Sequence, residues 1–301
     1  MIDLPRTGLG TAPLGGLFEA VSDETAEATF ELAWERGIRF FDTAPLYGLG
    51  LSEQRLGRFL AGKPRGDFVL ATKVGRLLRP DAPPDPDQAH WAGTPAVNPA
   101  FDFSYDGVLR SVDESLGRLG LDRIDVLYIH DPDDHYEEAL AGAYRALDRL
   151  RGEGTIRAVG AGMNQVEMLV AFAREAAFDC FLVAGRWTLL DRSALPDLLP
   201  LCEERGIAVI AAGVFNSGIL AGGTTFDYRP AAPEQLARAA ELEAVCARYG
   251  VPLAAAALQF PLRHPAVASA LLGPRSPAQL AQSLDLLAVP VPAGLWAELS
   301  A

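Results

Sequence analysis

The amino-acid sequence predicts a (β/α)₈ TIM-barrel fold, in one barrel domain that spans residues 1–301. Short apolar segments rich in β-branched or aromatic residues recur along the chain, and longer amphipathic segments alternate with them. Because parallel strands need helical crossovers, this alternation indicates a parallel sheet, and 301 residues are enough for eight such units. A doubly wound open sheet is the alternative. It is less favoured because no GxGxxG motif opens its first strand–helix unit.

Eight segments are predicted to be strands because each is short, apolar and followed by loop residues. They are residues 8–12, 38–42, 68–73, 125–130, 156–161, 180–184, 208–213 and 269–273. Apolar residues at i, i+3 and i+4, followed by a terminal glycine, predict helices within residues 22–37, 104–120, 195–206 and 233–250. Ser22 is expected to be the N-cap of the first helix.

One long segment, residues 76–103, is dense in proline and is predicted to be irregular. Loops of this length in a compact domain are usually functional or mobile. Because it follows a predicted strand, it is expected on the catalytic face, where it could wall a substrate pocket. His90 and Trp91 in this segment are candidate substrate contacts, with ordinary loop packing as the alternative.

The composition argues against several classes of partner. A net charge of −13 without a basic cluster argues against nucleic acid and anionic membranes. The longest apolar run, VPLAAAALQF, is too short to span a bilayer. The start of the sequence does not resemble a signal peptide, and the three cysteines form no CxxC pair. We therefore expect a cytoplasmic protein, whose oligomeric state the sequence leaves open.

Three predicted strands in succession end in a polar residue. Asp42 ends the second strand, Lys73 the third and His130 the fourth, and Tyr47 lies in the loop after Asp42. In a (β/α)₈ barrel the active site lies at these carboxyl ends of the strands. Each residue alone could be structural, as a helix cap, a salt bridge, loop packing or a core histidine. Together the four predict a catalytic group.

These four residue types suit proton transfer to a carbonyl. A tyrosine of ordinary pKa, about 10, is a poor acid or base at neutral pH. A nearby ammonium stabilises phenolate and lowers that pKa, and a carboxylate holds the ammonium in place. A histidine can then orient the substrate oxygen or share the proton.

The stretch LYIHDPDDH suggests a metal site as an alternative, formed by His130, Asp131, Asp133 and His135 in a metal-dependent barrel hydrolase. Barrel metal sites draw ligands from several strand ends, but no other predicted strand ends in histidine and no HxH motif occurs. We therefore expect no metal, and expect residues 133–135 to lead, solvated, into the next helix. A third alternative is a binding or regulatory protein with little turnover. The set of Asp42, Tyr47, Lys73 and His130 argues against it.

The sequence resembles the aldo-keto reductase family along nearly the whole chain. The resemblance rests on the stretches GIRFFDTAPLYGLGLSEQRLGRFL, ATKVG, RSVDESLGRLGLDRIDVLYIHDPD and SALLGPRSPAQLAQSLD. The stretches RTGLGTAPLGGLFEAVSDE, GAGMNQ and AAGVFNSGILAGG are most similar to bacterial members that oxidise sugars at C1. The resemblance implies an NAD(P)-dependent oxidoreductase acting on an aldose of the L-fucose or D-threo-aldose type. Pyridoxal 4-dehydrogenase activity or general aldehyde reduction is the alternative.

The resemblance also implies the role of each residue. Tyr47 would be the acid in reduction and, as phenolate, the base in oxidation. Lys73 would lower the pKa of Tyr47, Asp42 would pair with Lys73, and His130 would steer the reacting oxygen. A small-molecule sugar or aldehyde would be the substrate.

For the cofactor, the resemblance implies a nicotinamide that lies across the barrel mouth. Trp187 would stack on the nicotinamide, residues 213–218 would run beside the pyrophosphate, and residues 273–283 would hold the adenosine end. The implied cofactor-binding residues are Thr11, Asn164, Trp187, Gly213, Val214, Phe215, Asn216, Ser217, Gly218, Gly273, Arg275, Gln279, Gln282 and Ser283.

Several positions depart from the family pattern. The usual Ser-Asn after the fifth strand reads GMN, with Asn164 as the substitute, and the usual glutamine before the stacking residue is Ala184. The usual Glu-Asn in the cofactor tail reads Gln282-Ser283. Gln279 stands where an arginine often faces a 2′-phosphate, although Arg275 remains nearby. A lost arginine weakens NADP binding more than NAD binding, so NAD is favoured and dual use stays open.

Overall fold

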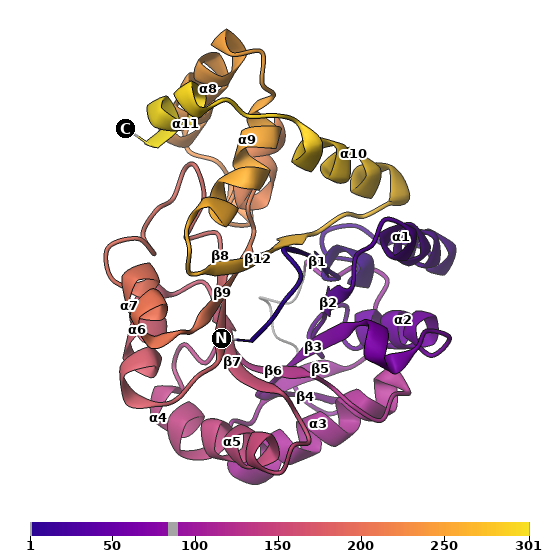
Figure 1. Cartoon of the computed structure of the whole chain (residues 1–301). Coiled ribbons are helices and arrows are strands. Elements are labelled where there is room, and N and C mark those ends of the chain that lie inside the picture. The colour runs from indigo at the N-terminus through magenta and orange to yellow at the C-terminus, as the bar shows by residue number, and fades with distance from the viewer. Residues whose placement is uncertain (1, 84–89, 301) are drawn as a thin grey trace.

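The computed structural model describes residues 2–83 and 90–300. In this part of the chain, eight parallel strands close into a barrel in the order β1-β12-β9-β8-β7-β6-β3-β2, and β2 pairs with β1. The helices lie around the outside of the strands (Figure 1). The predicted (β/α)₈ barrel is therefore confirmed, and the open-sheet alternative is wrong.

Each of the eight predicted strand segments overlaps one barrel strand. The strands are β1 Thr7–Gly10, β2 Phe40–Asp42, β3 Val69–Val74, β6 Val126–His130, β7 Ala158–Met163, β8 Cys180–Ala184, β9 Ala208–Ala212 and β12 Val267–Leu272. The parallel register pairs Asp42 with Ala71 and His130 with Gly162, so the carboxyl ends of neighbouring strands lie at the same rim.

Helices cover the barrel and short helical turns join them to the strands. The α-helices are α1 Asp23–Glu35, α2 Leu51–Leu60, α3 Tyr105–Leu119, α4 Tyr136–Glu138, α5 Arg145–Gly152, α6 Val166–Glu175, α7 Leu198–Arg205, α8 Pro233–Arg248, α9 Leu253–Gln259, α10 Pro277–Ala288 and α11 Ala293–Ser300. The shorter turns are η1 Pro13–Gly15, η2 Arg65–Asp67, η5 Asn216–Ala221, η6 Phe260–Arg263 and the π-helix η4 Ala139–Tyr144.

The helix ends follow the sequence signals. The Ser22 side chain accepts a hydrogen bond from the Thr25 amide, as expected of an N-cap, and Ser104 caps α3 in the same way. Gly120 and Gly206 end α3 and α7 in the left-handed conformation that favours glycine. The four helices predicted from apolar spacing are all present.

Two apolar layers hold the barrel together. The inner one fills the barrel with side chains such as Phe40, Tyr128 and Leu271, and the outer one packs the helices against the strands. Because the interior is filled, the barrel is no pore, and a substrate can reach only its ends.

The segment of residues 76–103 is more regular than predicted. β4 (Arg76–Arg79) and β5 (Asn98–Phe101) form an antiparallel hairpin directly after β3. The turn from β3 into β4 needs glycine, because Gly75 has a φ of 103° and a Cβ there would lie 2.0 Å from Phe103 Cε1. Residues 84–89 of this segment lie outside the described residues. A second small hairpin, β10 (Thr225–Phe226) with β11 (Arg229–Pro230), follows β9.

Two further features bear on the sequence expectations. No single helix among the described residues is long and apolar enough to cross a membrane; α10 and α11 pass that test only as a pair bent by 102°. The three cysteines are free thiols and are buried.

Candidate active site

The structure brings the polar ends of β2, β3 and β6 together, because these strands are neighbours in the barrel. Lys73 Nζ lies 2.7 Å from Asp42 Oδ1, and both side chains are almost completely buried. The same ammonium donates to the backbone oxygen of Thr43 at 2.8 Å. It also lies 4.6 Å from the centre of the Tyr47 ring and 5.6 Å from that of Tyr128. The predicted pairing of Asp42 with Lys73 is thus present beside Tyr47.

Tyr47 is positioned by close contact between two backbone segments. The loop after β2 lies against η1, and a Cβ at Gly48 would lie 2.1 Å from the backbone oxygen of Gly15. Gly48 also has a φ of 62°, which favours glycine. Glycine at both positions lets the chain turn tightly and leaves little freedom for the backbone that carries Tyr47.

Aromatic rings surround Tyr47 at the barrel mouth. The His130 ring lies edge-on to it, with centroids 5.8 Å apart and planes at 84°. The Trp91 ring lies 5.9 Å away, and His90 packs on Trp91 at 5.1 Å. The structure therefore places His90 and Trp91 beside the four polar residues, where a substrate wall was expected.

Burial dominates the ionisation of Tyr47. Desolvation raises its pKa well above 10, and the Asp42 carboxylate raises it further. This differs from the expectation that Lys73 lowers the pKa of Tyr47. The physical reason is that the Lys73 ammonium is bonded to Asp42 and Thr43, so the ion pair as a whole offers little net positive charge to the phenol. In this structure Tyr47 is a neutral proton donor.

His130 is also neutral. Burial lowers its pKa well below 6.5, and the positive charges of Arg76 and Lys73 lower it further. A neutral imidazole can donate one hydrogen bond and accept another, which suits the orientation of a carbonyl or hydroxyl oxygen.

Sequence reasoning did not place Arg76 at this site, and it named Asp131 only as a ligand of the alternative metal site. Arg76 opens β4, and its Nη1 lies 3.5 Å from His130 Nδ1. Asp131 follows β6, and its Oδ2 lies 3.4 Å from both His130 Nε2 and Arg76 Nη2. The only sequence signal was position: Asp131 is next to a strand end, and Arg76 lies just beyond one.

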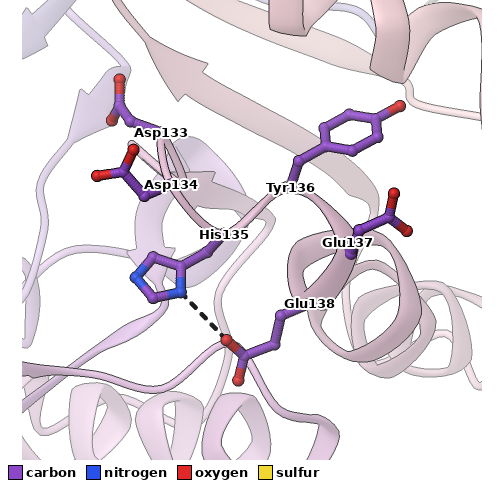
Figure 2. A pocket seen from close by; sticks show the side chains of 6 residues that line it. All are labelled: Asp133, Asp134, His135, Tyr136, Glu137 and Glu138. Carbon is purple, nitrogen blue, oxygen red and sulfur yellow. Dashed lines mark hydrogen bonds and ion pairs between the residues drawn. The ribbon is translucent and has the colours of Figure 1, made fainter.

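The end of LYIHDPDDH, residues 133–135, contacts other residues than those of the catalytic cluster. Residues 133–138 line a shallow surface pocket (Figure 2), in which His135 Nδ1 lies 3.3 Å from Glu138 Oε2. The His135 ring stacks on Phe101. Among residues 2–83 and 90–300, no group of three or more His, Cys, Asp and Glu side chains is placed to hold a metal ion.

Trp187, the expected nicotinamide-stacking residue, is largely buried. Its side chain is 7% exposed, its Nε1 donates to the backbone oxygen of Pro261, and its ring packs 4.7 Å from that of Phe260. This packing against η6 covers part of the indole, and stacking of Trp187 on the nicotinamide stays a prediction.

Thr11 is buried next to the backbone of Asp42. Its side chain has no exposed surface, and its hydroxyl bonds to the Asp42 backbone oxygen and to Ser52 Oγ at 2.9 and 2.7 Å. Asn164 is half-buried after β7, and its backbone oxygen accepts from Arg186 Nε at 3.0 Å. Thr11 was expected to contact the nicotinamide, but its hydroxyl is already engaged.

The segment of residues 213–218 follows β9 with an unusual backbone. Gly213, Asn216, Ser217 and Gly218 all have positive φ values, and Asn216 Nδ2 anchors the turn to the backbone oxygen of Gly185. Val214 is buried and Phe215 is half-buried. Backbone N–H groups gathered in a turn can form an anion-binding concavity, so this turn suits a phosphate group.

The segment after β12 leads into the start of α10. Gly273 is exposed, and Ser276 caps α10 by accepting from the Gln279 amide. The Gln279 side chain accepts from the Arg275 amide at 2.8 Å, while the Arg275 guanidinium lies 6.0 Å from the Phe18 ring. Gln282 is exposed and Ser283 half-buried, both on α10. A helix N-terminus beside an arginine suits a phosphate group of a nucleotide, so these residues fit a dinucleotide.

Comparisons with known proteins agree with this geometry. The model of the Aldo/keto reductase family matches residues 6–301. The chain belongs to the aldo/keto reductase family. Members of this family generally use NAD(P)H, and the chain is therefore an NAD(P)-linked oxidoreductase.

Two curated relatives in this family are equally similar to the chain. D-threo-aldose 1-dehydrogenase of Pseudomonas sp is 46% identical over 307 residues, covering 99% of this chain and 93% of the relative. Pyridoxal 4-dehydrogenase of Microbacterium luteolum is 46% identical over 315 residues, covering 97% and 92%. Among solved structures, a glycerol dehydrogenase from Gluconobacter oxydans superposes with a TM-score of 0.78 at 27% identity, covering 99% and 92%.

Proposed function

We propose that this chain is an aldose 1-dehydrogenase, which oxidises a sugar of the L-fucose or D-threo-aldose type at C1 with NAD(P). The observation that carries the proposal is the cluster of Asp42, Tyr47, Lys73 and His130 at the barrel mouth. The 46% identity to a D-threo-aldose 1-dehydrogenase over nearly the full length supports the choice of substrate.

In the proposed mechanism Tyr47 exchanges the proton of the reacting oxygen. The bound nicotinamide supplies hydride acceptance in oxidation and hydride donation in reduction. The neutral Tyr47 donates its proton to a carbonyl oxygen during reduction, and its phenolate takes the hydroxyl proton during oxidation. Because burial keeps the pKa of Tyr47 well above 10, the phenolate is scarce at neutral pH and oxidation is the more demanding direction.

Lys73 and Asp42 hold this tyrosine in place. The Lys73 ammonium lies 4.6 Å from the centre of the Tyr47 ring, and Asp42 and the Thr43 backbone oxygen fix it there. His130 lies edge-on to Tyr47 and is neutral, so it can donate a hydrogen bond to the same substrate oxygen and select its orientation.

The proposed cofactor is NAD, with NADP as a second choice. Residues 213–218 would receive the pyrophosphate, and Arg275 with the start of α10 would receive the adenosine end. Gln279 carries no charge for a 2′-phosphate, and its side chain accepts from the Arg275 backbone. A 2′-phosphate would therefore rely on Arg275 alone, which lowers the advantage of NADP. We also propose a cytoplasmic location, since the three thiols are free and buried.

Pyridoxal is the second candidate substrate, because the pyridoxal 4-dehydrogenase relative is equally identical to this chain. A panel of L-fucose, D-arabinose, L-galactose and pyridoxal, each with NAD and with NADP, separates the candidates. The proposal expects the highest kcat/KM for an aldose with NAD. A higher kcat/KM for pyridoxal would replace the aldose by the second candidate, and no turnover of any of the four would overturn the proposal.

A further inference from the structure

Two charged side chains beside His130 have no part in the proton transfer described above. Arg76 is the first residue of β4, and Asp131 is the first residue after β6. We propose that Asp131 binds a hydroxyl group of the substrate next to the reacting carbon, and that Arg76 positions both Asp131 and His130 for this contact. The inference rests on the proposed oxidation of an aldose and deepens it, since it names the residue that selects a polyhydroxylated substrate.

The contacts of Arg76 determine where the His130 proton lies. A guanidinium can only donate hydrogen bonds. Arg76 Nη1 lies 3.5 Å from His130 Nδ1, so Nδ1 is the acceptor and the proton of the neutral ring is on Nε2. Nε2 in turn lies 3.4 Å from Asp131 Oδ2. Arg76 thus holds the tautomer that presents an N–H on the side of the ring where Asp131 lies.

Arg76 is itself firmly held. Its backbone pairs with Phe101 in the β4–β5 hairpin, and its guanidinium lies 5.1 Å from the centre of the Phe101 ring. Its side chain is 9% exposed, so its charge is poorly screened by water. A buried cation in this position can keep His130 unprotonated and Asp131 in place at the same time.

The backbone of Asp131 is also unusual. Its φ of 40° lies in the left-handed region, which few residues other than glycine, asparagine and aspartate adopt. Its amide donates to the backbone oxygen of Gly162, which ties the turn to the end of β7. Strained backbone conformations of this kind are common at functional sites, where they help to orient a side chain. Here it follows directly after His130.

Asp131 lies beside His130 at the barrel mouth and is partly open to solvent. The side chain is 31% exposed, and within the described part of the chain only Oδ2 forms hydrogen bonds or ion pairs. Oδ1 can therefore accept from a ligand.

A carboxylate accepts hydrogen bonds and cannot donate them when ionised, so it selects a ligand that offers a hydroxyl. An aldose presents a hydroxyl group on C2, the carbon bonded to C1, and a simple aldehyde presents none there. Hydrogen bonds to charged groups are stronger than neutral ones, which makes Asp131 a determinant of sugar specificity.

The test of Asp131 compares the Asp131→Asn variant with the wild type on L-fucose and on its monodeoxy analogues. Asparagine tolerates the left-handed backbone, so the turn is preserved. Asp134→Asn, which removes an exposed charge three residues away, is the matched control. We expect Asp131→Asn to lower kcat/KM for L-fucose about tenfold or more, by the loss of a charge-assisted hydrogen bond, and Asp134→Asn to leave it unchanged.

One analogue identifies the contacted hydroxyl. For the sugar that lacks this group, Asp131→Asn should cause no further loss, because the contact is already absent. An equal loss on every analogue and on a simple aldehyde would overturn the role of Asp131 while leaving the proposed function intact. No turnover of any aldose by the wild type would overturn both.

The role of Arg76 is tested by the pH dependence of kcat/KM. The charged or titratable groups around His130 are Arg76, Lys73, Asp131 and Tyr47. Removing the Arg76 charge allows the pKa of His130 to rise, so in Arg76→Met the acid limb of the profile should move to higher pH. Arg79→Met, in the same strand, should leave that limb in place.

A second variant separates charge from geometry. Arg76→Lys keeps the positive charge but loses the simultaneous contacts of the guanidinium with His130 and Asp131. The acid limb of the pH profile of kcat/KM should therefore stay at the same pH, while kcat falls. An unchanged limb in folded Arg76→Met, or wild-type kcat in Arg76→Lys, would overturn the positioning role of Arg76.

Discussion

Lys73 and Asp42 form an ion pair of 2.7 Å at the floor of the barrel mouth, where each side chain is at most 2% exposed. Such a pair is costly to break, because removing one partner leaves an uncompensated buried charge. The pair thus serves both the stability of the barrel and the placement of the ammonium beside Tyr47.

The first prediction follows from this pair. Asp42→Asn should lower the free energy of unfolding by about 3 kcal/mol, since Lys73 loses its buried counter-charge. Glu241→Gln, which removes one half of the exposed pair with Arg238, should change it by less than about 0.5 kcal/mol. Urea unfolding of both variants measures the difference. Equal stability of the two variants would contradict the account.

The second prediction concerns pH. Because the pKa of Tyr47 is raised well above its usual 10.0, the phenol stays protonated through the neutral range. The phenolate fraction then grows about tenfold per pH unit as the pH rises, so kcat/KM for oxidation should climb from about pH 7 to about pH 10 without a plateau. Reduction, which uses the protonated form, should stay nearly flat over the same range. A plateau of the oxidation rate near neutral pH would show that the pKa is lowered instead.

The third prediction concerns tryptophan fluorescence. Trp91 lies 5.9 Å from the Tyr47 ring, whereas Trp187 is buried against Phe260. Addition of NAD or NADP should therefore quench fluorescence mainly through Trp91. The Trp91→Phe variant should lose most of the quenching, and Trp187→Phe should retain it. If Trp187→Phe lost the quenching and Trp91→Phe retained it, Trp187 would be the residue that contacts the cofactor.

The fourth prediction concerns the backbone beneath Tyr47. Gly48→Ala would place a Cβ 2.1 Å from the Gly15 backbone oxygen, at a φ of 62°. We expect a loss of about 2 kcal/mol or more in the free energy of unfolding, from left-handed strain and overlap. Activity should fall with it, since the loop that carries Tyr47 must shift. Gly62→Ala, which meets nothing within 4 Å, is the control and should be nearly neutral.

Much of the site could be predicted from the sequence because strand ends are visible in it. Asp42, Lys73 and His130 each end a run of apolar residues, and the barrel rule places such ends at one rim. The structure adds that β2, β3 and β6 are neighbours, which brings the three side chains together.

Side-chain direction could not be predicted in the same way. Trp187 follows β8 at the expected position, but its indole packs against η6, a segment far away in the sequence. Asp131 resembled the start of a solvated loop, and its left-handed backbone, which accompanies its contact with His130, has no signature in a single sequence. Arg76 lies in a segment that was predicted to be irregular, so its position could not be predicted. In the structure the β4–β5 hairpin fixes it.

The turnover of Tyr47→Phe tests the central claim most directly. Phenylalanine keeps the ring beside His130 and Lys73 but cannot exchange a proton. Measured with an aldose and NAD at saturating cofactor, kcat/KM should fall by about 10²–10⁴-fold, the usual contribution of a general acid or base, while nucleotide binding seen by tryptophan fluorescence stays unchanged. Turnover at the wild-type rate by a variant that binds the cofactor normally would contradict the role of Tyr47.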